Sequence, residues 1–392
     1  MIAPPRHERR PNPTEVEPDT YLYERYVDRR LRNQALRVYY TIKPLLPRGL
    51  QLAMRRLYAR RQALRTFPAW PIEPLLVDHQ NEQLRWRLRA SRTTRLPLVH
   101  FWPDGRQFAA VVTHDVETSA GLDNIDALLD LERGHDIVSA WNFVAEDYRI
   151  PDGTFDRIRA AGGEIGLHGI THDGDLFTDH QTFQAELVKI HRYLRDWGAV
   201  GFRSPGTRRN ADWMSELGCL YDSSFPDTDP FEPQPGGCCS IFPYFIGDLV
   251  ELPITLAQDH TLWEILRVPS IDVWRNKGDW LISQHGLLNV IVHPDYISTP
   301  ERLARYDELL GYLRSRLDSH DGWHALPRDV ASWWKARASL RVEGAEGGAH
   351  IVSENGAGGY AERAAVAWAH ERDGTMTFDA GASAELARQK LA

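Results

Sequence analysis

The alternation of apolar and polar positions is most regular between residues 105 and 340. Short apolar runs alternate there with longer amphipathic stretches, which predicts repeated strand–helix units. Such units pair their strands in parallel, so the pattern indicates an α/β fold with a barrel or a doubly wound sheet. The expected strands are 108–113, 137–144, 164–167, 200–202, 220–222, 249–252, 288–292 and 323–326, and the expected helices are 123–132, 154–161, 181–197, 211–217, 272–285, 302–317 and 329–340.

The segments on either side have different patterns. Residues 1–20 are rich in proline, arginine and glutamate and are expected to be disordered, whereas 21–43 and 50–65 are expected to be helices. Five prolines between residues 66 and 107 predict an irregular connection. Short apolar stretches separated by glycine turns follow residue 340. The expected organisation is a disordered segment 1–20, a helical and irregular extension 21–104, a barrel 105–340 and a small β-rich tail 341–392.

Polar side chains follow four of the expected strands at their C-terminal ends. In a β/α barrel these ends converge on one face, where active sites are built. His168 and His172 are four residues apart, so both rings can reach one divalent cation. This pair alone is a weak signal in a chain with 16 histidines, but the other polar strand ends strengthen it. The residues at these ends are His114, Asp115, Glu117, His168, His172, Arg203 and His293.

Five short motifs, taken in order and spacing, resemble the polysaccharide deacetylases, the carbohydrate esterases that share a NodB-homology domain. They are Thr113-His114-Asp115-Val116-Glu117, His168-Gly169-Ile170-Thr171-His172, Phe202-Arg203-Ser204-Pro205-Gly206, Tyr221-Asp222-Ser223-Ser224 and Val290-Ile291-Val292-His293. The resemblance covers about residues 105–335. It implies a distorted (β/α) barrel, a divalent metal that is most often zinc, and hydrolysis of an N-acetyl group on an amino sugar.

The resemblance also implies roles for the first motif and the histidine pair. His168 and His172 would bind the metal together with an acidic residue of the first motif. The family often has two adjacent aspartates there, a base and a ligand, but Val116 holds the second position in this chain. A variant spacing makes Asp115 the base and Glu117 the ligand, and the opposite assignment stays open.

Further roles follow from the other motifs. Arg203 would hold the base ionised, Pro205 and Gly206 would lie at the oxyanion position, and His293 would protonate the leaving amine. Three aspartates could orient His293, and two others could support the metal-binding histidines. The three are Asp272, Asp279 and Asp295, and the two are Asp173 and Asp175.

Two alternative functions remain open at this point. The same residues would suit an amidohydrolase acting on a small cyclic amide or ureide, and the barrel could bind carbohydrate without catalysis. The 13 tryptophans are better explained by a large aromatic core than by sugar-stacking platforms. The long loop 226–248 at the expected barrel mouth, together with the tryptophans, nevertheless favours a sugar substrate over a small ureide.

The charge distribution bears on partners and location. Residues 1–65 carry 15 Lys+Arg against 6 Asp+Glu, a balance of +9, so the remainder carries −8 − 9 = −17. The basic segment 41–65 is expected to pack Leu50, Met54 and Leu57 on the acidic barrel, in preference to a peripheral contact with an anionic membrane.

Other features indicate the compartment. There are three cysteines, the N-terminus lacks an apolar leader, and no stretch of 18 apolar residues occurs. We therefore expect a cytoplasmic protein, with the inner face of the membrane as the alternative location. The expected partner is a carbohydrate and not a nucleic acid, and the sequence leaves the oligomeric state open.

Overall fold

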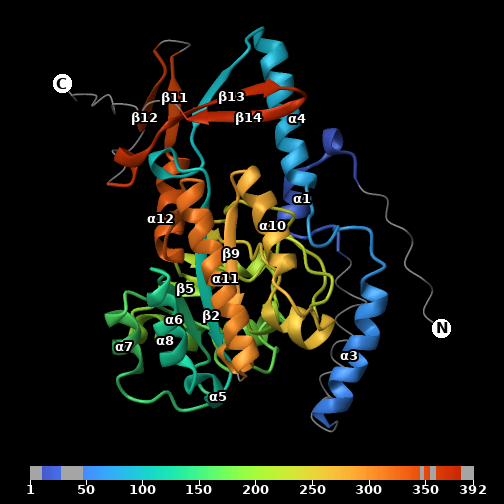
Figure 1. The fold of residues 1–392 in the computed structure, drawn as a ribbon, viewed down its shortest axis with the longest axis vertical. Helices are drawn as coiled ribbons and strands as arrows, with labels where there is room; N and C mark the ends of the chain where they lie inside the picture. The colour runs from blue at the N-terminus through green and yellow to red at the C-terminus, as the bar shows by residue number, and fades with distance from the viewer. Residues whose placement is uncertain (1–10, 28–46, 298, 345–347, 354–358, 381–392) are drawn as a thin grey trace.

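A curled sheet forms the centre of the molecule (Figure 1). The computed structural model describes residues 11–27, 47–297, 299–344, 348–353 and 359–380. The nine strands run in the order β10-β2-β3-β4-β5-β6-β8-β7, and β9 also pairs with β2. All these pairings are parallel except β7 with β8. The strands are β2 (Ala109–Val116), β3 (Ser139–Phe143), β4 (Glu164–Leu167), β5 (Gly201–Phe202), β6 (Tyr221–Asp222), β7 (Tyr244–Ile246), β8 (Leu249–Glu251), β9 (Leu287–Val292) and β10 (Trp323–His324).

The sheet curls because the segment after β8 returns to β9. The backbone N–H of Leu256 donates to the carbonyl of Asn289 at 3.2 Å, and the Thr255 hydroxyl donates to the carbonyl of Leu287 at 2.6 Å. The result is the distorted α/β barrel expected from the sequence, with few complete strand–helix units. All eight residues of β2 are buried, as expected for a central parallel strand covered on both faces.

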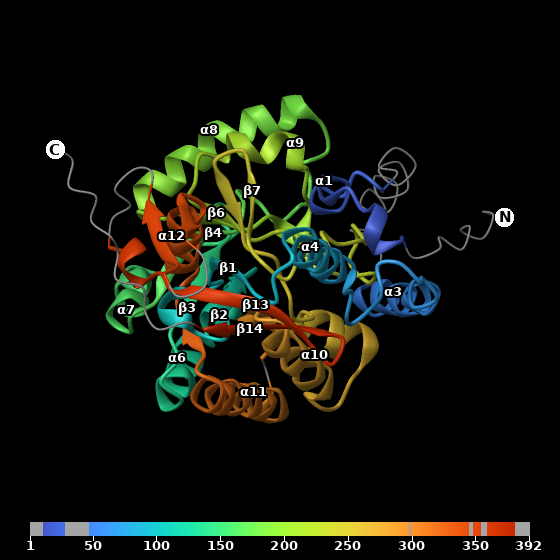
Figure 2. The ribbon, with the colours of Figure 1, turned by 90° about the horizontal axis from the view of Figure 1, so that it is seen from above.

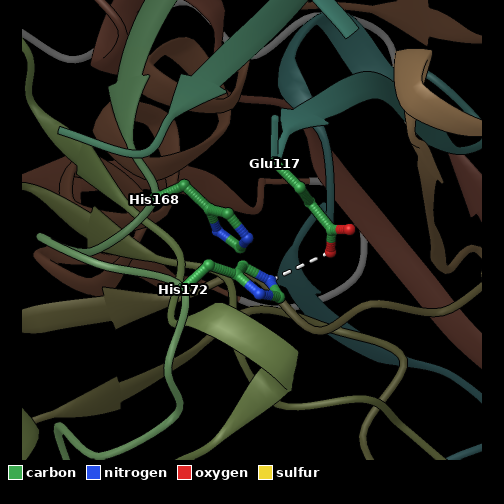
Figure 3. Close-up of side chains that lie close together, drawn as sticks. All are labelled: Glu117, His168 and His172. Carbon is green, nitrogen blue, oxygen red and sulfur yellow. Dashed lines mark ion pairs between the residues drawn. The ribbon is translucent and has the colours of Figure 1, made fainter. Parts of the chain in front are cut away.

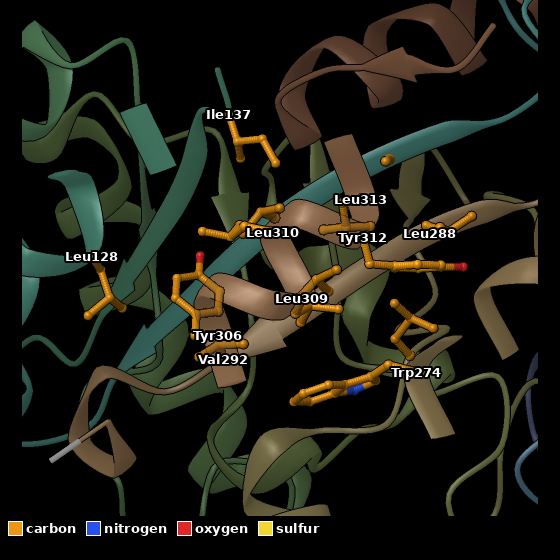
Figure 4. Close-up of a cluster of buried hydrophobic side chains, with 14 of the residues drawn as sticks. Leu128, Ile137, Trp274, Leu288, Val292, Tyr306, Leu309, Leu310, Tyr312 and Leu313 are labelled. Carbon is orange, nitrogen blue, oxygen red and sulfur yellow. The ribbon is translucent and has the colours of Figure 1, made fainter. Parts of the chain in front are cut away.

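Helices surround the sheet (Figure 2). The apolar side of α11, formed by Tyr306, Leu309, Leu310 and Leu313, packs in the main core with Val292 of β9 (Figure 4). These positions recur every three or four residues, which places them on one helical face. Several tryptophans are fully buried, in agreement with the expected aromatic core. The helices are α5 (Ser119–Leu122), α6 (Ile125–Gly134), α7 (Thr154–Ala160), α8 (His180–Trp197), α9 (Ala211–Met214), α10 (Asp272–Ser283), α11 (Pro300–Ser319), α12 (Pro327–Ala338) and the π-helix η6 (His260–Leu266).

The N-terminal extension corrects two expectations. Residues 1–10 and 28–46 lie outside the described residues, but 11–22 contain the 3-10 turn η1 (Pro13–Glu15) and the helix α1 (Pro18–Leu22). The expected disorder is therefore wrong for 11–20, because Val16 is buried and the carbonyl of Pro13 contacts Nδ1 of His79 at 2.7 Å. The expected helix 21–43 is wrong at its start, since turns follow α1 as far as residue 27.

The expected irregular connection 66–107 is also wrong in part. It contains helix α4 (Leu75–Ser91) and strand β1 (Leu96–Val99). Pro74 is the N-cap of α4, so the three prolines that precede the helix do not interrupt it. Pro97 is accommodated because β1 is an edge strand.

Small antiparallel sheets lie at one end of the barrel (Figure 1). One joins β1 to β13 (Val366–Arg372) and β14 (Thr375–Ala380), and the other joins β11 (Leu340–Glu343) to β12 (His350–Ser353). The expected β appendage is thus present, and it recruits a strand from the N-terminal extension. Within the described ranges, no helix is both long and apolar enough to cross a lipid bilayer.

Helix α3 (Arg48–Gln62) confirms the helix expected at 50–65 and packs against the barrel, but with a different face. Leu50, Met54 and Leu57 were expected to face the barrel, yet they are 48%, 46% and 61% exposed. The barrel-facing side instead includes Leu52 and the buried Ala59, which cluster with the barrel residues Phe231 and Ile265.

Candidate metal and catalytic site

Strand β2 is longer than the sequence pattern predicts, so most of the first motif lies within the strand and not in the loop after it. The strand continues to Val116, so His114 and Asp115 lie within it and point to opposite sides. Nδ1 of His114 contacts the carbonyl of Val292 at 3.0 Å, and its other ring nitrogen pairs with Glu132. His114 thus joins a buried network outside the site, whereas Asp115 lines the reaction cavity.

Glu117, His168 and His172 come together as a candidate metal centre (Figure 3). One ligand atom from each lies within 4.8 Å of the other two, and Nε2 of His172 is 3.0 Å from Oε1 of Glu117. Two imidazoles and one carboxylate are the donor set of a catalytic zinc site that keeps an open position. The three residues predicted as ligands therefore fit a divalent cation.

The surroundings of His168 support this fit. Its Nδ1 lies 3.0 Å from the carbonyl of Arg203, which can only accept a hydrogen bond, so we assign the ring proton to Nδ1. Nε2 then carries a lone pair, and within the described chain this buried atom has no hydrogen-bond partner. An imidazole fixed through one nitrogen with the other left free is the usual arrangement of a metal-binding histidine.

The protonation states also suit metal binding. Burial lowers the pKa of His168 to about 4, so the ring is neutral at neutral pH. Burial raises the pKa of Glu117, but His172 and the neighbouring histidines outweigh this effect and hold the pKa well below its usual range. A neutral imidazole and an ionised carboxylate are the forms that bind a cation.

Asp115 is buried beside this trio and is held by two donors. Nδ2 of Asn142 donates to its Oδ1 at 2.8 Å, and Nη1 of Arg203 donates to the same oxygen at 3.1 Å. Oδ2 lies 3.9 Å from Nδ1 of His168. Burial raises the pKa of Asp115, but Arg203 and the two nearest histidines outweigh it and lower the pKa to about 2. The predicted pairing of Arg203 with this carboxylate is present.

Arg203 is itself fixed inside the barrel. Its Nε donates to the carbonyl of Ser223 at 2.7 Å, and Nη2 donates to the hydroxyl of the same residue at 2.8 Å. Nη1 also donates to the hydroxyl of Thr113 at 2.8 Å. The guanidinium therefore has one orientation, and Asp115 is positioned against a rigid partner.

His293 is oriented by Asp259, which the sequence did not single out. The Asp259 carboxylate accepts from the backbone N–H of His293 at 2.9 Å and lies 2.6 Å from Nδ1 of its ring. Nε2 of His293 lies 3.7 Å from Oε1 of Glu117 and 4.0 Å from Oδ2 of Asp115. Burial lowers the pKa of His293, but Asp259 and the other two carboxylates outweigh it and raise the pKa to about 10.

The three aspartates proposed to orient His293 have other partners. Asp272 accepts from the hydroxyl of Ser270, and Asp279 accepts from Arg316 and Tyr312. Asp295 accepts from the backbone N–H groups of Glu117 and Thr118, so it positions the metal-binding loop. No sequence pattern marks Asp259, because its contact with His293 joins residues 34 positions apart.

The loop that carries His172 is shaped by acidic side chains. Asp147 accepts from the backbone N–H of His172 at 2.6 Å. Asp173 accepts from the hydroxyl of Thr171 and from the backbone N–H of Asp175. Asp173 thus supports the loop backbone, and a direct role for it or Asp175 at the metal stays a prediction.

The trio, Asp115 and His293 share one cavity of about 420 Å³. Gly206 lines it with φ +57°, a backbone conformation that favours glycine. Pro205 packs against Gly169, where a Cβ would approach Cγ of the proline to 2.7 Å. The oxyanion role of these two residues stays a prediction. The other lining residues are Gln51, Leu52, Arg55, Thr207, Glu232, Pro233, Gln258, His260, Ile265 and Tyr296.

The cavity also includes residues that no sequence motif marks. Gln51, Leu52 and Arg55 belong to α3, so the N-terminal extension forms one wall. Tyr296 donates its hydroxyl to Oε2 of Glu117 at 3.2 Å. No tryptophan occurs among the described residues that line the cavity, so the tryptophans belong to the core and do not give the expected support for a sugar substrate.

Comparison with known proteins finds similarity only among solved structures. No family model and no curated protein sequence matches this chain. A structure from Mycobacterium smegmatis, provisionally named a polysaccharide deacetylase, is 23% identical, with a TM-score of 0.49, over 60% of this chain and 93% of that one. A structure named Puue allantoinase is 19% identical, with a TM-score of 0.45, over 60% and 92%. A third, from Pseudomonas aeruginosa PAO1 and also provisionally named a polysaccharide deacetylase, is 19% identical, with a TM-score of 0.45, over 59% and 92%.

Proposed function

We propose that this chain is a metal-dependent hydrolase that removes the N-acetyl group from an amino sugar, with zinc as its metal. The observation that carries the proposal is that one cavity brings together three metal-ligand atoms, a buried carboxylate and a carboxylate-paired imidazole. Amide hydrolysis needs a polarised carbonyl, a deprotonated water and a protonated leaving nitrogen. The cavity contains a group suited to each task.

Glu117, His168 and His172 would hold the metal. When bound, the metal polarises the amide carbonyl and lowers the pKa of a water molecule. The chain fixes the ligands beforehand, because the carbonyl of Arg203 orients the His168 ring and Asp295 holds the backbone of Glu117. This preorganisation favours one position of the reacting carbonyl.

Asp115 is proposed to accept the proton of the attacking water. Its Oδ1 is occupied by Asn142 and Arg203, whereas Oδ2 is within 4.0 Å of Nε2 of His293. Because the pKa of Asp115 is lowered to about 2, the carboxylate is ionised at neutral pH and free to act as an acceptor. This geometry supports Asp115 as base and Glu117 as ligand over the opposite assignment.

His293 is proposed to protonate the leaving amine. Asp259 holds Nδ1, so the proton to be donated is at Nε2, which faces the Glu117 and Asp115 carboxylates. The raised pKa of His293, about 10, keeps this proton in place at neutral pH. The backbone N–H of Gly206, which lines the cavity, is proposed to assist the developing oxyanion.

An amino sugar is favoured as the substrate by the cavity walls. Gln51, Glu232, Gln258 and His260 supply hydrogen-bonding groups in addition to those of the metal trio, as a ligand rich in hydroxyl groups requires. A small cyclic ureide remains the second candidate, since the same trio would serve its hydrolysis. We propose a cytoplasmic location and a biosynthetic role as parts of the same hypothesis.

Acetate release tests the proposed function. The zinc-loaded protein is incubated with N-acetylated sugars, sugar nucleotides, lipid-linked glycans and, separately, with cyclic ureides. We expect acetate from at least one amino sugar and none from the His168→Ala variant, whose metal content is measured in parallel. Turnover of a ureide without any acetate release would favour the second candidate, and a metal-loaded protein inactive on both classes would contradict catalysis.

A further inference from the structure

Helix α3 concentrates the exposed apolar surface of the protein. Eight large hydrophobic side chains are exposed in the described part of the chain, and five of them lie between residues 50 and 64. They are Leu50, Met54, Leu57, Tyr58 and Leu64. Within α3, positions 50, 54, 57 and 58 follow helical spacing, so they form one stripe, which we call the outer face of α3; Leu64 lies just beyond the end of the helix at Gln62.

The opposite side of α3 is already fixed to the barrel. Nη2 of Arg55 donates to the carbonyl of Phe231 at 2.6 Å, and Nε of Arg56 donates to the carbonyl of Glu264 at 2.9 Å. Ala59 is 3% exposed and packs on Phe231 and Ile265. The barrel therefore does not cover the outer face, although the sequence suggested that it would.

The charged residues of the segment that carries the outer face are all basic. Residues 47–65 contain six arginines and no acidic residue, whereas residues 66–392 have a net charge of −17. Arg60, Arg61 and Arg65 are exposed beside the apolar stripe. An apolar stripe flanked by cations is the pattern of a helix that lies in the surface of an anionic bilayer.

The same helix forms a wall of the reaction cavity. Gln51, Leu52 and Arg55 line the cavity, while Leu50 and Met54, one residue away from them, belong to the outer face. The side of α3 opposite the outer face is hydrogen-bonded to the barrel. Any surface that binds the outer face is therefore held next to the cavity. Figure 1 shows α3 at the side of the molecule away from α7 and α8.

We propose that the outer face of α3 docks on an anionic lipid surface and that the cavity acts on an amino sugar carried by a lipid. The assignment of a lipid-carried amino sugar as substrate rests on the proposed function. The docking of α3 does not depend on it. The arginines bind lipid headgroups, and the apolar stripe enters the boundary between headgroups and acyl chains. A lipid-linked sugar then reaches the cavity without leaving the membrane surface.

Vesicle sedimentation tests the docking. The full chain is mixed with vesicles of phosphatidylcholine alone or with about one third phosphatidylglycerol, at low and high salt. We expect binding to the anionic vesicles that weakens with salt. The triple variant Leu50→Gln/Met54→Gln/Leu57→Gln should bind at least about tenfold more weakly, and Arg60→Gln should bind about fivefold more weakly.

Val188→Gln is the matched control, because Val188 is 73% exposed on the remote helix α8. It should bind vesicles as the wild type does, and thermal unfolding should show that every variant is folded. The docking is overturned if the wild type does not bind anionic vesicles, or if the triple variant binds them equally well. It is also overturned if the wild type is a dimer that the triple variant dissociates, because a second copy would then cover the outer face.

Acetate assays test whether the substrate is an amino sugar carried by a lipid. With an N-acetylated glycolipid in anionic vesicles, the triple variant should lose at least about tenfold in kcat/KM, whereas on a soluble N-acetyl sugar it should match the wild type. Equal losses on both substrates would refute the lipid-linked substrate. If the wild type releases acetate from neither substrate, the proposed function fails, and the vesicle result still decides the docking.

Discussion

The substitution Asp115→Asn separates the two roles that the sequence left open for the acidic residues. In the structure Oδ1 of Asp115 accepts from both Asn142 and Arg203. The amide oxygen of an asparagine can take this place, which puts its NH₂ group where Oδ2 faces the cavity. The variant therefore keeps the local geometry and replaces a basic oxygen with a nitrogen that cannot accept a proton. If Asp115 is the base, activity should fall by about two to four orders of magnitude while the metal is retained.

The stability change can be estimated from the same contacts. The pKa of Asp115 is lowered from 3.8 to about 2 in the fully buried site. A difference of roughly 1.8 units at about 1.4 kcal/mol each corresponds to about 2 kcal/mol of stability. Because the folded pKa is the lower one, this contribution is present above pH 4 and is lost as the pH falls toward 2. The Asn variant should thus be less stable by about 2 kcal/mol at pH 7 and equally stable near pH 2.

Three measurements check this prediction together. Elemental analysis gives the metal bound per chain, urea unfolding gives the stability at each pH, and acetate release gives kcat/KM. Glu117→Gln is the matched comparison, and it should lose metal affinity first. Loss of the metal from Asp115→Asn, together with its retention in Glu117→Gln, would reverse the two roles and refute the reasoning from the hydrogen bonds.

Four further predictions concern the same framework. His168→Ala or a strong chelator should remove most of the metal, as elemental analysis would show, since two remaining ligands hold zinc poorly; full occupancy would disprove the centre. Asp259→Asn should shift the alkaline limb of the pH–rate profile to lower pH, because Asp259 is the main group raising the pKa of His293; an unchanged limb would exclude the pairing from catalysis. His293→Ala should impair an aryl acetate far less than an N-acetyl sugar, and equal losses would contradict an acid role. Glu24→Gln should lower the free energy of unfolding in urea by about 3–5 kcal/mol, because it leaves Arg209 buried without its charge partner; a change below 1 kcal/mol would show that the pair is dispensable.

The strand–helix periodicity of residues 105–340 was enough to predict a parallel α/β fold, and the resemblance of the motifs selected the barrel. Buried parallel strands have short, continuous apolar sequences, and this pattern depends on local sequence alone. The same logic located the polar strand ends, and the resemblance grouped His168 and His172 with an acidic residue of the first motif, with the choice between Asp115 and Glu117 left open. The position of Asp115 within β2, two residues beyond Thr113, also follows from strand alternation once the strand is extended to Val116.

The N-terminal extension shows where local patterns failed. The prolines between 66 and 107 predict irregular structure, but Pro74 caps a helix and Pro97 lies in an edge strand. The amphipathic pattern of α3 indicated a helix correctly but assigned the wrong face to the barrel. Periodicity identifies which residues share a face, and it contains no information about the surface that this face meets.

The sequence by itself determined the fold class, the order of the motifs and the two histidines able to bind a metal. Only the tertiary structure decided that Asp259 orients His293, that Oδ1 of Asp115 is occupied by Asn142 and Arg203, and that α3 forms a wall of the cavity. Each of these contacts joins residues that are far apart in the chain. Such contacts are set by how separate elements pack, and packing depends on shape and on the satisfaction of buried polar groups across the whole molecule.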